Sequence, residues 1–349
     1  MRAVVYERVG DPEVLHLIDR PDPIPGPGEV LVRVAFSGVN PTDWKTRRGP
    51  GPDQPPTELP FPQMVPNQDG SGTIVGVGEG VARDRIGQRV WLWEAAWQRA
   101  DGTAQELVAL PSGRAVPLPE GASLELGASL GIPSLTAHRC LTVSEDGPVH
   151  LGPGALTGRT VLVAGGAGAV GHATIELAGW AGARVVTTVS SPEKASLAHS
   201  AGAEHVVNYR AEDAARAVRR LVPGGVDLIV EVAPGANAEL DQAVLANHGT
   251  IVAYASDRDA VALKIRPNMV VNARYQFVLV YTEPDAAKLR ALDDVQSAVR
   301  SGALRVGQEF GLPLHRFPLE RTSDAHAAVE SNIVGKVLIE LQADQALTP

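Results

Sequence analysis

The sequence predicts an α/β protein of two domains, one rich in β-strands and one built on a doubly wound parallel sheet. The 349 residues suffice for roughly two domains of about 150 residues each. Up to about residue 120, short apolar and β-branched runs alternate with clusters of Gly and Pro. From about residue 125, β-branched runs alternate with Ala-rich segments of helical length, which is typical of parallel strands joined by crossover helices.

In the N-terminal part, the runs bounded by turn residues predict a compact, mostly β domain. The expected strands are EVLVRVAFSGV (29–39), GSGTIVGVG (70–78) and QRVWLW (88–93). The clusters RPDPIPGPG (20–28) and GPGPDQPPTELPFPQ (49–63) separate them.

In the second part, six β-branched runs predict the parallel sheet: TVLVAG (160–165), RVVTTV (184–189), HVVNY (205–209), DLIVEV (227–232), TIVAY (250–254) and YQFVLV (275–280). A helix is expected over 283–304, with Gly302 near its end, and a last strand over GKVLIEL (335–341). We therefore expect a first domain over 1–126, a doubly wound domain over 127–281, and a return segment over 282–349 that completes the first domain.

The composition excludes several functional classes. A formal charge of -9 without a long Lys or Arg run speaks against a nucleic-acid partner. The single cysteine, Cys140, excludes an internal disulfide and a multi-cysteine zinc cluster. No stretch of about 18 apolar residues and no signal-peptide core is present, so we expect a cytoplasmic protein without a membrane partner.

The segment TVLVAGGAGAVGHATIELAGWAGA (160–183) combines a strand, a glycine turn and a helix. Gly166, Gly168 and Gly171 fit G-x-G-x-x-G, and Gly165 extends the glycine turn. Such a turn lets backbone N–H groups, including those of Ala169 and Val170, approach the pyrophosphate of a dinucleotide. The alternative is a tight turn that binds nothing.

The stretch TTVSSPEKAS (187–196) indicates which dinucleotide binds. A carboxylate is expected about 20 residues after the glycine turn, where it would bind the ribose 2′-hydroxyl of NAD. The sequence has Ser190 and Ser191 there, with Lys194 nearby. Hydroxyls and an ammonium suit a 2′-phosphate, so NADPH is predicted as the cofactor. Ser191 before Pro192 also fits a helix N-cap, and the two roles are compatible.

These motifs occur together with others along nearly the whole chain: GVNPTDWKTRRG, PNQDGSGTIVGVGEGV, GQRVW, LGIPSLTAHRCL, GRTVLVAGGAGAVG, SAGAEHVVNYR and AHAAVESNIVGKVLIEL. In them the chain resembles the quinone oxidoreductase (ζ-crystallin-like) branch of the medium-chain dehydrogenase/reductase family. The resemblance implies a GroES-like catalytic domain split by a Rossmann domain that binds NADPH. It also implies a homodimer, which we expect to pair through YQFVLV.

Zinc-dependent members of the same superfamily hold a catalytic metal through Cys, His and Cys. Matching by motif places these positions at Asn40, Gln68 and Ile132, none of which belongs to that ligand set. The nine histidines show no HxxxH or HxH spacing. We therefore expect a zinc-independent enzyme, which favours reduction of an activated electrophile over oxidation of an alcohol.

The resemblance also implies cofactor contacts by position. Ser190, Lys194 and Tyr209 would hold the adenosine 2′-phosphate, and the backbone from Gly165 to Gly171 the pyrophosphate. The nicotinamide end would lie near Asn40 and Thr136 and near the backbone around Ala253, Val278 and Val280. Tyr209 could instead be a packed ring at a strand end, and Asn40 a turn residue before Pro41.

For the substrate, a quinone or an enone, the candidate residues are Asn40, Trp44, Lys45, Trp91 and Trp93. Trp91 and Trp93 would form either an aromatic wall or a small core, and Lys45 either stabilises an oxyanion or faces solvent. No catalytic residue is assigned. The predicted function is an NADPH:quinone reductase-like oxidoreductase. The alternatives are an enoyl or 2-enone reductase of secondary metabolism and a non-catalytic NADPH-binding protein.

Overall fold

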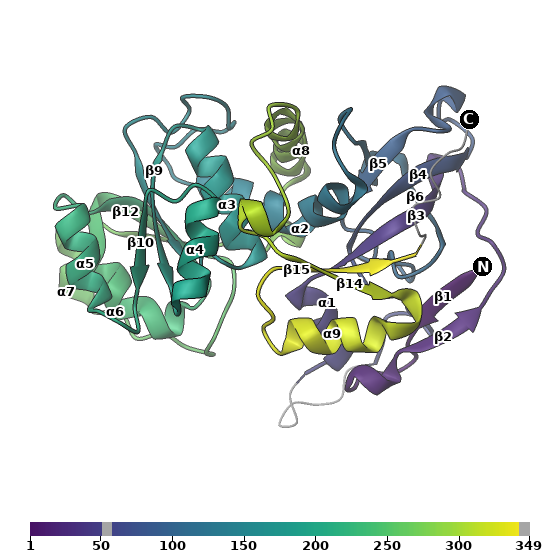
Figure 1. The fold of residues 1–349 in the computed structure, drawn as a ribbon, viewed down its shortest axis with the longest axis horizontal. Coiled ribbons are helices and arrows are strands. Elements are labelled where there is room, and N and C mark those ends of the chain that lie inside the picture. The colour runs from purple at the N-terminus through teal and green to yellow at the C-terminus, as the bar shows by residue number, and fades with distance from the viewer. Residues whose placement is uncertain (51–57, 342–349) are drawn as a thin grey trace. The chain divides into compact units, whose positions relative to one another are not determined.

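The computed structural model describes residues 1–50 and 58–341. The middle of the Gly- and Pro-rich cluster at 49–63 therefore lies outside the described residues. The chain divides into two compact units (Figure 1). Unit 1 comprises Met1–Ile132 and Leu314–Pro349, and unit 2 comprises Pro133–Pro313.

Unit 2 is built on a six-stranded parallel sheet with the strand order β10-β9-β8-β11-β12-β13. Its strands are β8 (Thr160–Ala164), β9 (Arg184–Val189), β10 (His205–Asn208), β11 (Val226–Glu231), β12 (Leu245–Ala253) and β13 (Arg274–Phe277). All six strands predicted for this region are present. The order is that of the Rossmann fold, which confirms the predicted fold class.

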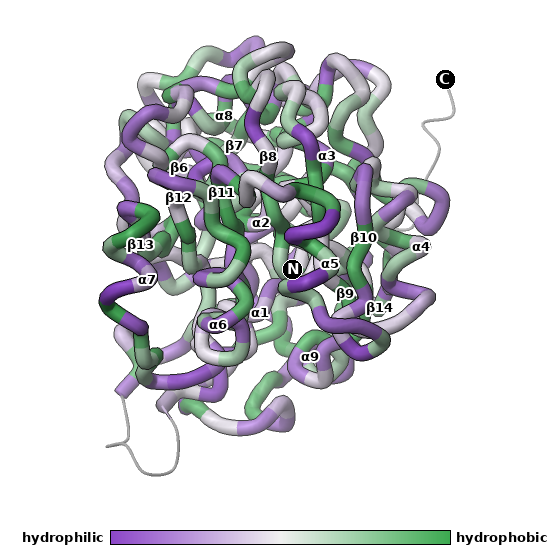
Figure 2. The backbone as a smooth tube through the Cα atoms, turned by 90° about the vertical axis from the view of Figure 1, so that its left-hand side faces the viewer, coloured by the Kyte–Doolittle hydropathy of each residue, from purple (hydrophilic) through white to green (hydrophobic). Residues whose placement is uncertain are grey.

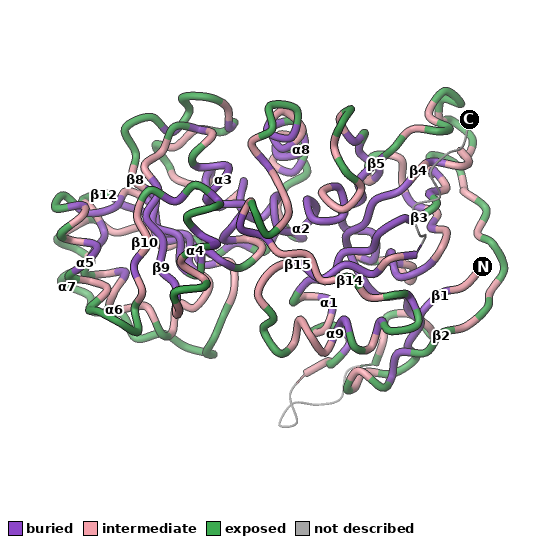
Figure 3. The backbone as a smooth tube through the Cα atoms, viewed as in Figure 1, coloured by how far each residue is buried: buried purple, intermediate pink, exposed green. Residues whose placement is uncertain are grey.

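Helices cover both faces of this sheet: α3 (Ala169–Trp180), α4 (Pro192–Ser200), α5 (Ala214–Leu221) and α6 (Pro234–Val244), joined by α7 (Ile265–Val270) and α8 (Asp285–Arg300). Figure 1 shows α3 and α4 on one side of the strands and α5 and α6 on the other. Because both faces are covered, the inner strands β8, β9 and β11 are mostly buried (Figure 3) and consist largely of apolar residues, as the colour of β11 in Figure 2 illustrates. The edge strands β10 and β13 are more exposed.

The strand order also fixes where a ligand can bind in unit 2. β8 and β11 are neighbours, although two strands lie between them in the sequence. The connections after these two strands run to opposite faces of the sheet and leave a crevice at the carboxyl ends. The glycine turn follows β8, so it lies at that crevice.

Unit 1 contains a seven-stranded sheet of GroES-like type, with the order β14-β15-β3-β4-β5-β7 and with β6 paired to β3. Its strands are β3 (Glu29–Val39), β4 (Asp69–Val77), β5 (Arg89–Leu92), β6 (Leu107–Pro111), β7 (Ala115–Pro117), β14 (Leu314–Pro318) and β15 (Lys336–Glu340), and β1 (Arg2–Val5) and β2 (His16–Asp19) form a separate hairpin. Strand β15 pairs antiparallel with β3, so the C-terminal segment closes the sheet that the N-terminal segment begins.

Two helices belong wholly to unit 1, α1 (Pro41–Arg48) and α9 (Thr322–Glu330). Short 3-10 turns lie at Pro12–Val14, Arg83–Arg85, Ser112–Arg114, Val280–Thr282, Gln308–Phe310 and Leu319–Arg321. In the described part of the chain, no helix combines the length and the apolar character that crossing a membrane requires.

The unit boundaries differ from those expected at 126/127 and 281/282. Helix α2 (Leu124–Thr142) runs across the first boundary, and the change of unit follows its break at Gly131. Helix α8 stays in unit 2, because Asp294 accepts hydrogen bonds from the Leu151 backbone (2.7 Å) and pairs with His138 of α2 (2.7 Å). The change in amino-acid composition along the chain does not reveal these long-range contacts, so it could not predict the boundaries.

Candidate functional site

The glycine turn joins β8 to α3 in unit 2. Gly165 has a φ of 70°, which favours glycine, and its N–H donates to the Thr188 carbonyl of β9 at 3.1 Å. Gly168 is the N-cap residue of α3. The turn is thus tied to the neighbouring strand while the first turn of α3 begins with free backbone donors.

The space around each glycine, tested by adding a Cβ atom, distinguishes glycines required by packing from one that is not. On Gly166 it would lie 2.2 Å from Thr187 Oγ1, and on Gly171 it would lie 2.4 Å from the Gly165 carbonyl oxygen. These two glycines are therefore required by packing. On Gly168 the nearest atom would be 3.5 Å away, which is an ordinary contact. The missing side chain at Gly168 leaves room that the protein does not use, as a bound pyrophosphate would require.

The first turn of α3 contains Ala169 and Val170 and no acidic side chain. Its N–H groups and the helix dipole therefore favour an anion at this end. The residues present fit the phosphates of a dinucleotide.

Two side-chain hydrogen bonds organise the stretch after β9. The Lys194 backbone N–H donates to Ser191 Oγ at 3.3 Å, so Ser191 is the N-cap of α4. The Lys194 ammonium donates to Ser190 Oγ at 3.0 Å. Tyr209 is half exposed and its N–H donates to the Val189 carbonyl, so it lies beside this pair rather than in a packed core.

The other predicted cofactor positions in unit 2 are buried. The Val278 N–H donates to the Ala253 carbonyl at 2.9 Å, which joins the ends of β12 and β13. Val280 and Thr136 are also buried. Thr136 lies in unit 2 and Asn40 in unit 1.

A buried pair of carboxyl groups is formed by Glu231, the last residue of β11, and Asp241 of α6. Glu231 accepts hydrogen bonds from the Ala233 N–H (2.5 Å) and from Asn237 Nδ2 (2.9 Å). Burial and the neighbouring Glu231 raise the pKa of Asp241 to about 9, so the pair keeps a proton at neutral pH. No sequence motif indicated this pair.

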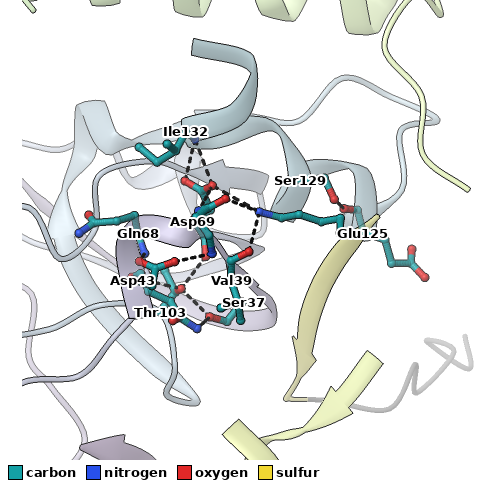
Figure 4. Close-up of polar contacts among 12 residues, drawn as sticks. Ser37, Val39, Asp43, Gln68, Asp69, Thr103, Glu125, Ser129 and Ile132 are labelled. Atoms are coloured by element: carbon teal, nitrogen blue, oxygen red, sulfur yellow. Dashed lines mark hydrogen bonds and ion pairs between the residues drawn. The ribbon is translucent and has the colours of Figure 1, made fainter. Parts of the chain in front are cut away.

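In unit 1, polar side chains gather around the Asp69 carboxylate (Figure 4). It accepts hydrogen bonds from Asn40 Nδ2 at 2.7 Å and from the Ile132 N–H at 2.9 and 3.0 Å. The Lys336 ammonium lies 3.8 Å from the same carboxylate and donates to Asn40 Oδ1 at 2.7 Å. We call Asn40, Asp43, Asp69 and Lys336 the buried polar cluster.

The break in α2 supplies one of these donors. Gly131 departs from helical geometry, with φ -22° and ψ -109°, and the following Ile132 N–H points to Asp69. A Cβ atom on Gly131 would lie 2.0 Å from Asp69 Oδ1. Glycine is therefore needed here because the carboxylate approaches the backbone closely.

Asp43 extends the cluster through α1. Its carboxylate accepts from the Asn40 N–H at 2.6 Å and from the Gln68 N–H at 3.1 Å. Burial and the nearby Asp69 charge raise the pKa of Asp43 to about 7. Burial also raises the pKa of Asp69 and lowers that of Lys336, while attraction between the two opposes both shifts.

The three positions that match zinc ligands by motif have other partners. Asn40 is held between Asp69 and Lys336, Gln68 Oε1 accepts from the Ala96 N–H at 3.2 Å, and Ile132 contributes only its backbone. Over 1–50 and 58–341, no three His, Cys, Asp or Glu side chains are grouped so that they could hold a metal ion.

The tryptophans divide between surface and core. Trp91 has no exposed surface, and Trp93 is 8% exposed with its Nε1 donating to the Gly113 carbonyl. Both pack in the interior, so of the two alternatives the small core describes them and an aromatic wall does not. Trp44 is partly buried, with the exposed Lys45 ammonium 5.7 Å from its ring centre.

Sequence reasoning missed Asp43, Asp69 and Lys336 as functional candidates. The available signal was weak: Lys336 is a charge inside the strand GKVLIEL, and Asp69 opens a strand of small and apolar residues. A charge at a buried strand position predicts a partner but does not say which.

Comparisons with known proteins agree with this architecture. The model of the alcohol dehydrogenase GroES-like domain matches residues 26–120, and that of the zinc-binding dehydrogenase matches 169–296. A quinone oxidoreductase of Rattus norvegicus is 29% identical, with 98% of each chain covered. A rat homologue of the synaptic vesicle membrane protein VAT-1 is 30% identical over 73% of this chain and 59% of its own.

Solved structures give the same result. Mycobacterial Rv1454c, solved in complex with NADPH, is 30% identical with a TM-score of 0.78, and the match covers 98% of this chain and 100% of that one. A structure described as an NAD-dependent alcohol dehydrogenase is 28% identical with a TM-score of 0.83 over 98% and 100%. The chain therefore belongs to the medium-chain dehydrogenase/reductase family, as an oxidoreductase of its quinone oxidoreductase-like branch.

Proposed function

We propose that this protein is an NADPH-dependent, zinc-free reductase that transfers hydride to a quinone or a similarly activated alkene. The observation that carries the choice of cofactor is the pair formed by Lys194 and Ser190, whose polar atoms lie 3.0 Å apart after β9. An ammonium and a hydroxyl stand where a carboxylate would bind the ribose of NAD. The NADPH complex of a 30% identical mycobacterial relative supports the same choice.

NADPH, when bound, supplies the hydride. The chain binds and orients it: the turn from Gly165 to Gly171 holds the pyrophosphate, and Lys194, Ser190 and Tyr209 hold the 2′-phosphate. The strand ends at Ala253 and Val278 lie at the carboxyl edge of the same parallel sheet, where a dinucleotide lies in this fold. Within unit 2 the nicotinamide end is assigned to this backbone and to Thr136, and Asn40 of unit 1 is the candidate for contact with the substrate.

The donor set of unit 1 supports a reaction without zinc. Asn40 and Gln68 are neutral amides, and the Asp69 carboxylate already has a cation, Lys336, at 3.8 Å. A zinc ion bound by one carboxylate and two amides would lack the soft or imidazole ligands it prefers. Without a Lewis acid, an acceptor that is already electron-poor is the better substrate.

The relatives named quinone oxidoreductases support a quinone as the acceptor. Hydride transfer to such a planar acceptor needs mainly its alignment with the nicotinamide, with the proton delivered separately. Trp44, with Lys45 and Arg48 5.7 and 5.5 Å from its ring centre, is the aromatic candidate for this contact.

The test of the cofactor assignment is Lys194→Ala. We expect kcat/KM for NADPH to fall about 10-fold to 100-fold, as for loss of a charge-assisted contact, with little change for NADH. Lys264→Ala, which removes an exposed lysine whose ammonium pairs with the exposed Glu239, is the matched control. An unchanged ratio of NADPH to NADH efficiency would refute the assignment.

The test of the substrate is turnover with NADPH of 1,4-naphthoquinone, a 2-enone and a crotonyl thioester. Activity on the quinone alone supports the proposal. Activity on the enone or thioester alone identifies an enoyl reductase instead. Tight NADPH binding without turnover of any of the three would identify a nucleotide-binding protein without this activity.

We also propose a homodimer that pairs through the edge strand β13. Exposed apolar side chains gather on β13 and the adjoining α7: Phe277 is 73% exposed, Ile265 71%, and Met269 and Val270 67% each. An edge strand beside exposed apolar side chains is a surface for pairing with a second copy. Light scattering should give a dimer mass for the protein and a monomer mass for Phe277→Asp, and a monomeric wild type would contradict the proposal.

A further inference from the structure

We propose that Asp69 and Lys336 are positioning residues that fix the orientation of the Asn40 carboxamide. The inference rests on the proposed function only in assigning Asn40 to the reaction. The orientation itself is a property of unit 1 and can be measured without cofactor or substrate.

The two partners of the amide have opposite and unambiguous hydrogen-bonding character. Lys336 Nζ can only donate, and it contacts Asn40 Oδ1 at 2.7 Å. The Asp69 carboxylate accepts when ionised, and it contacts Asn40 Nδ2 at 2.7 Å. A half-turn of the amide would place its N–H groups against the ammonium and its oxygen against the carboxylate. Both hydrogen bonds would be lost and replaced by repulsion.

Burial makes this preference strong. Asn40 is 2% exposed, Lys336 1% and Asp69 0%, so water cannot replace either partner. Two further contacts hold the partners in place: Lys336 donates to the Val39 carbonyl at 3.3 Å, and Asp69 accepts from the Ile132 N–H at 2.9 Å. In such surroundings a charge-assisted hydrogen bond is worth more than at a surface.

The hydrogen bonds to Asp69 and from Lys336 leave part of the Asn40 carboxamide for a ligand. Nδ2 carries two hydrogens and Asp69 accepts one, while Oδ1 accepts from Lys336 and, in the capping box of α1, from the Asp43 backbone. The second hydrogen of Nδ2 therefore has a single direction. A donor whose direction is set before the ligand arrives costs no reorganisation during the reaction.

The orientation is tested by NMR on protein labelled with 15N-asparagine. The Asn40 side-chain signals are identified by their loss in Asn40→Ala. We expect one pair of signals that exchanges slowly with solvent at neutral pH. Two sets of signals, or exchange as fast as for the exposed Asn247, would overturn the proposal on the wild-type protein alone.

The variant Asp69→Asn with Lys336→Met removes both charges together and so leaves neither buried charge without a partner. We expect its Asn40 signals to broaden or double and to exchange at least about tenfold faster. Glu212→Gln with Arg220→Met, which neutralises an exposed ion pair in unit 2, is the control and should leave them unchanged. Unchanged Asn40 signals in the folded Asp69→Asn/Lys336→Met variant would also refute the proposal that these two residues fix the carboxamide.

The functional consequence is tested by a mutant cycle. Asn40→Ala and Asp69→Asn/Lys336→Met should each lower kcat about tenfold while the dissociation constant for NADPH stays within about twofold. Combined, they should lower kcat no further, because the pair acts through Asn40. Additive losses would refute the positioning role. No turnover by the wild type would instead count against the proposed function and leave the NMR result standing.

Discussion

The stretch after β9 in unit 2 and the buried polar cluster of unit 1 are built in opposite ways. The stretch after β9 joins neighbours in sequence: Ser190 and Lys194 are four residues apart, and their contact is partly exposed. The cluster joins Asn40 to Lys336, which are 296 residues apart and almost fully buried. A local, solvated site can change its ligand preference at small cost in stability, whereas a buried site of unlike charges makes stability and function inseparable.

The largest expected effect is on stability, and it appears when a lysine is replaced by methionine in each region. Lys336→Met leaves Asp69 buried without its cation and should lower the free energy of unfolding by about 3–5 kcal/mol. Lys194→Met should change it by no more than about 0.5 kcal/mol, because its contact is partly solvated. Urea denaturation followed by circular dichroism measures both. Equal losses of unfolding free energy in the two variants would contradict the difference proposed between the two regions.

Two glycines separate folding from binding within the glycine turn. Gly171→Ala brings a Cβ to 2.4 Å from a backbone oxygen and should cost about 1–3 kcal/mol of stability. Gly168→Ala has room, with its nearest contact at 3.5 Å, and should cost less than about 1 kcal/mol. It should nevertheless weaken NADPH binding at least about tenfold, because the Cβ enters the space assigned to phosphate. Unaltered NADPH fluorescence titrations would place the phosphates elsewhere.

The carboxyl pair of Glu231 and Asp241 shows that unit 2 also has a buried titrating site. The pKa of Asp241 is raised to about 9, so the folded protein holds a proton that the unfolded chain releases above its ordinary value of 3.8. The free energy of unfolding should therefore fall as pH rises between about 4 and 9, by at most about 1.4 kcal/mol per pH unit. Asp241→Asn imitates the protonated acid and should flatten this slope in denaturation curves at pH 6, 7 and 8. A slope identical to that of the wild type would show that another group is responsible.

The smallest effects distinguish the two serines. Ser191→Ala removes the N-cap of α4 and should cost about 1 kcal/mol without changing the preference for NADPH over NADH. Ser190→Ala should do the reverse, lowering that preference with little loss of stability. Thermal unfolding and steady-state kinetics on the two variants check this, and an exchanged pattern would reverse the two roles.

The same division explains what could be predicted. All six strands of the Rossmann sheet, the glycine turn and the Ser191 cap depend on local patterns, and the sequence predicts them. The placement of α8 depends on Asp294 and partners more than 140 residues away, so the boundary expected at 281/282 differs from that of the structure. The partners of Asp69 and the interior position of Trp91 depend on tertiary packing in the same way. Periodicity shows that a position is buried, but not what lies opposite it.

The split of unit 1 has a consequence for synthesis on the ribosome. Unit 2, residues 133–313, is complete before β14 and β15 emerge, so its sheet can close while unit 1 still lacks two strands. Lys336 is the first residue of β15, and it reaches Asp69 only after unit 2 has been synthesised. Until then the nascent N-terminal segment holds Asp69 without its cation. Unit 1 thus matures last, and chaperone dependence is expected to centre on the first 132 residues.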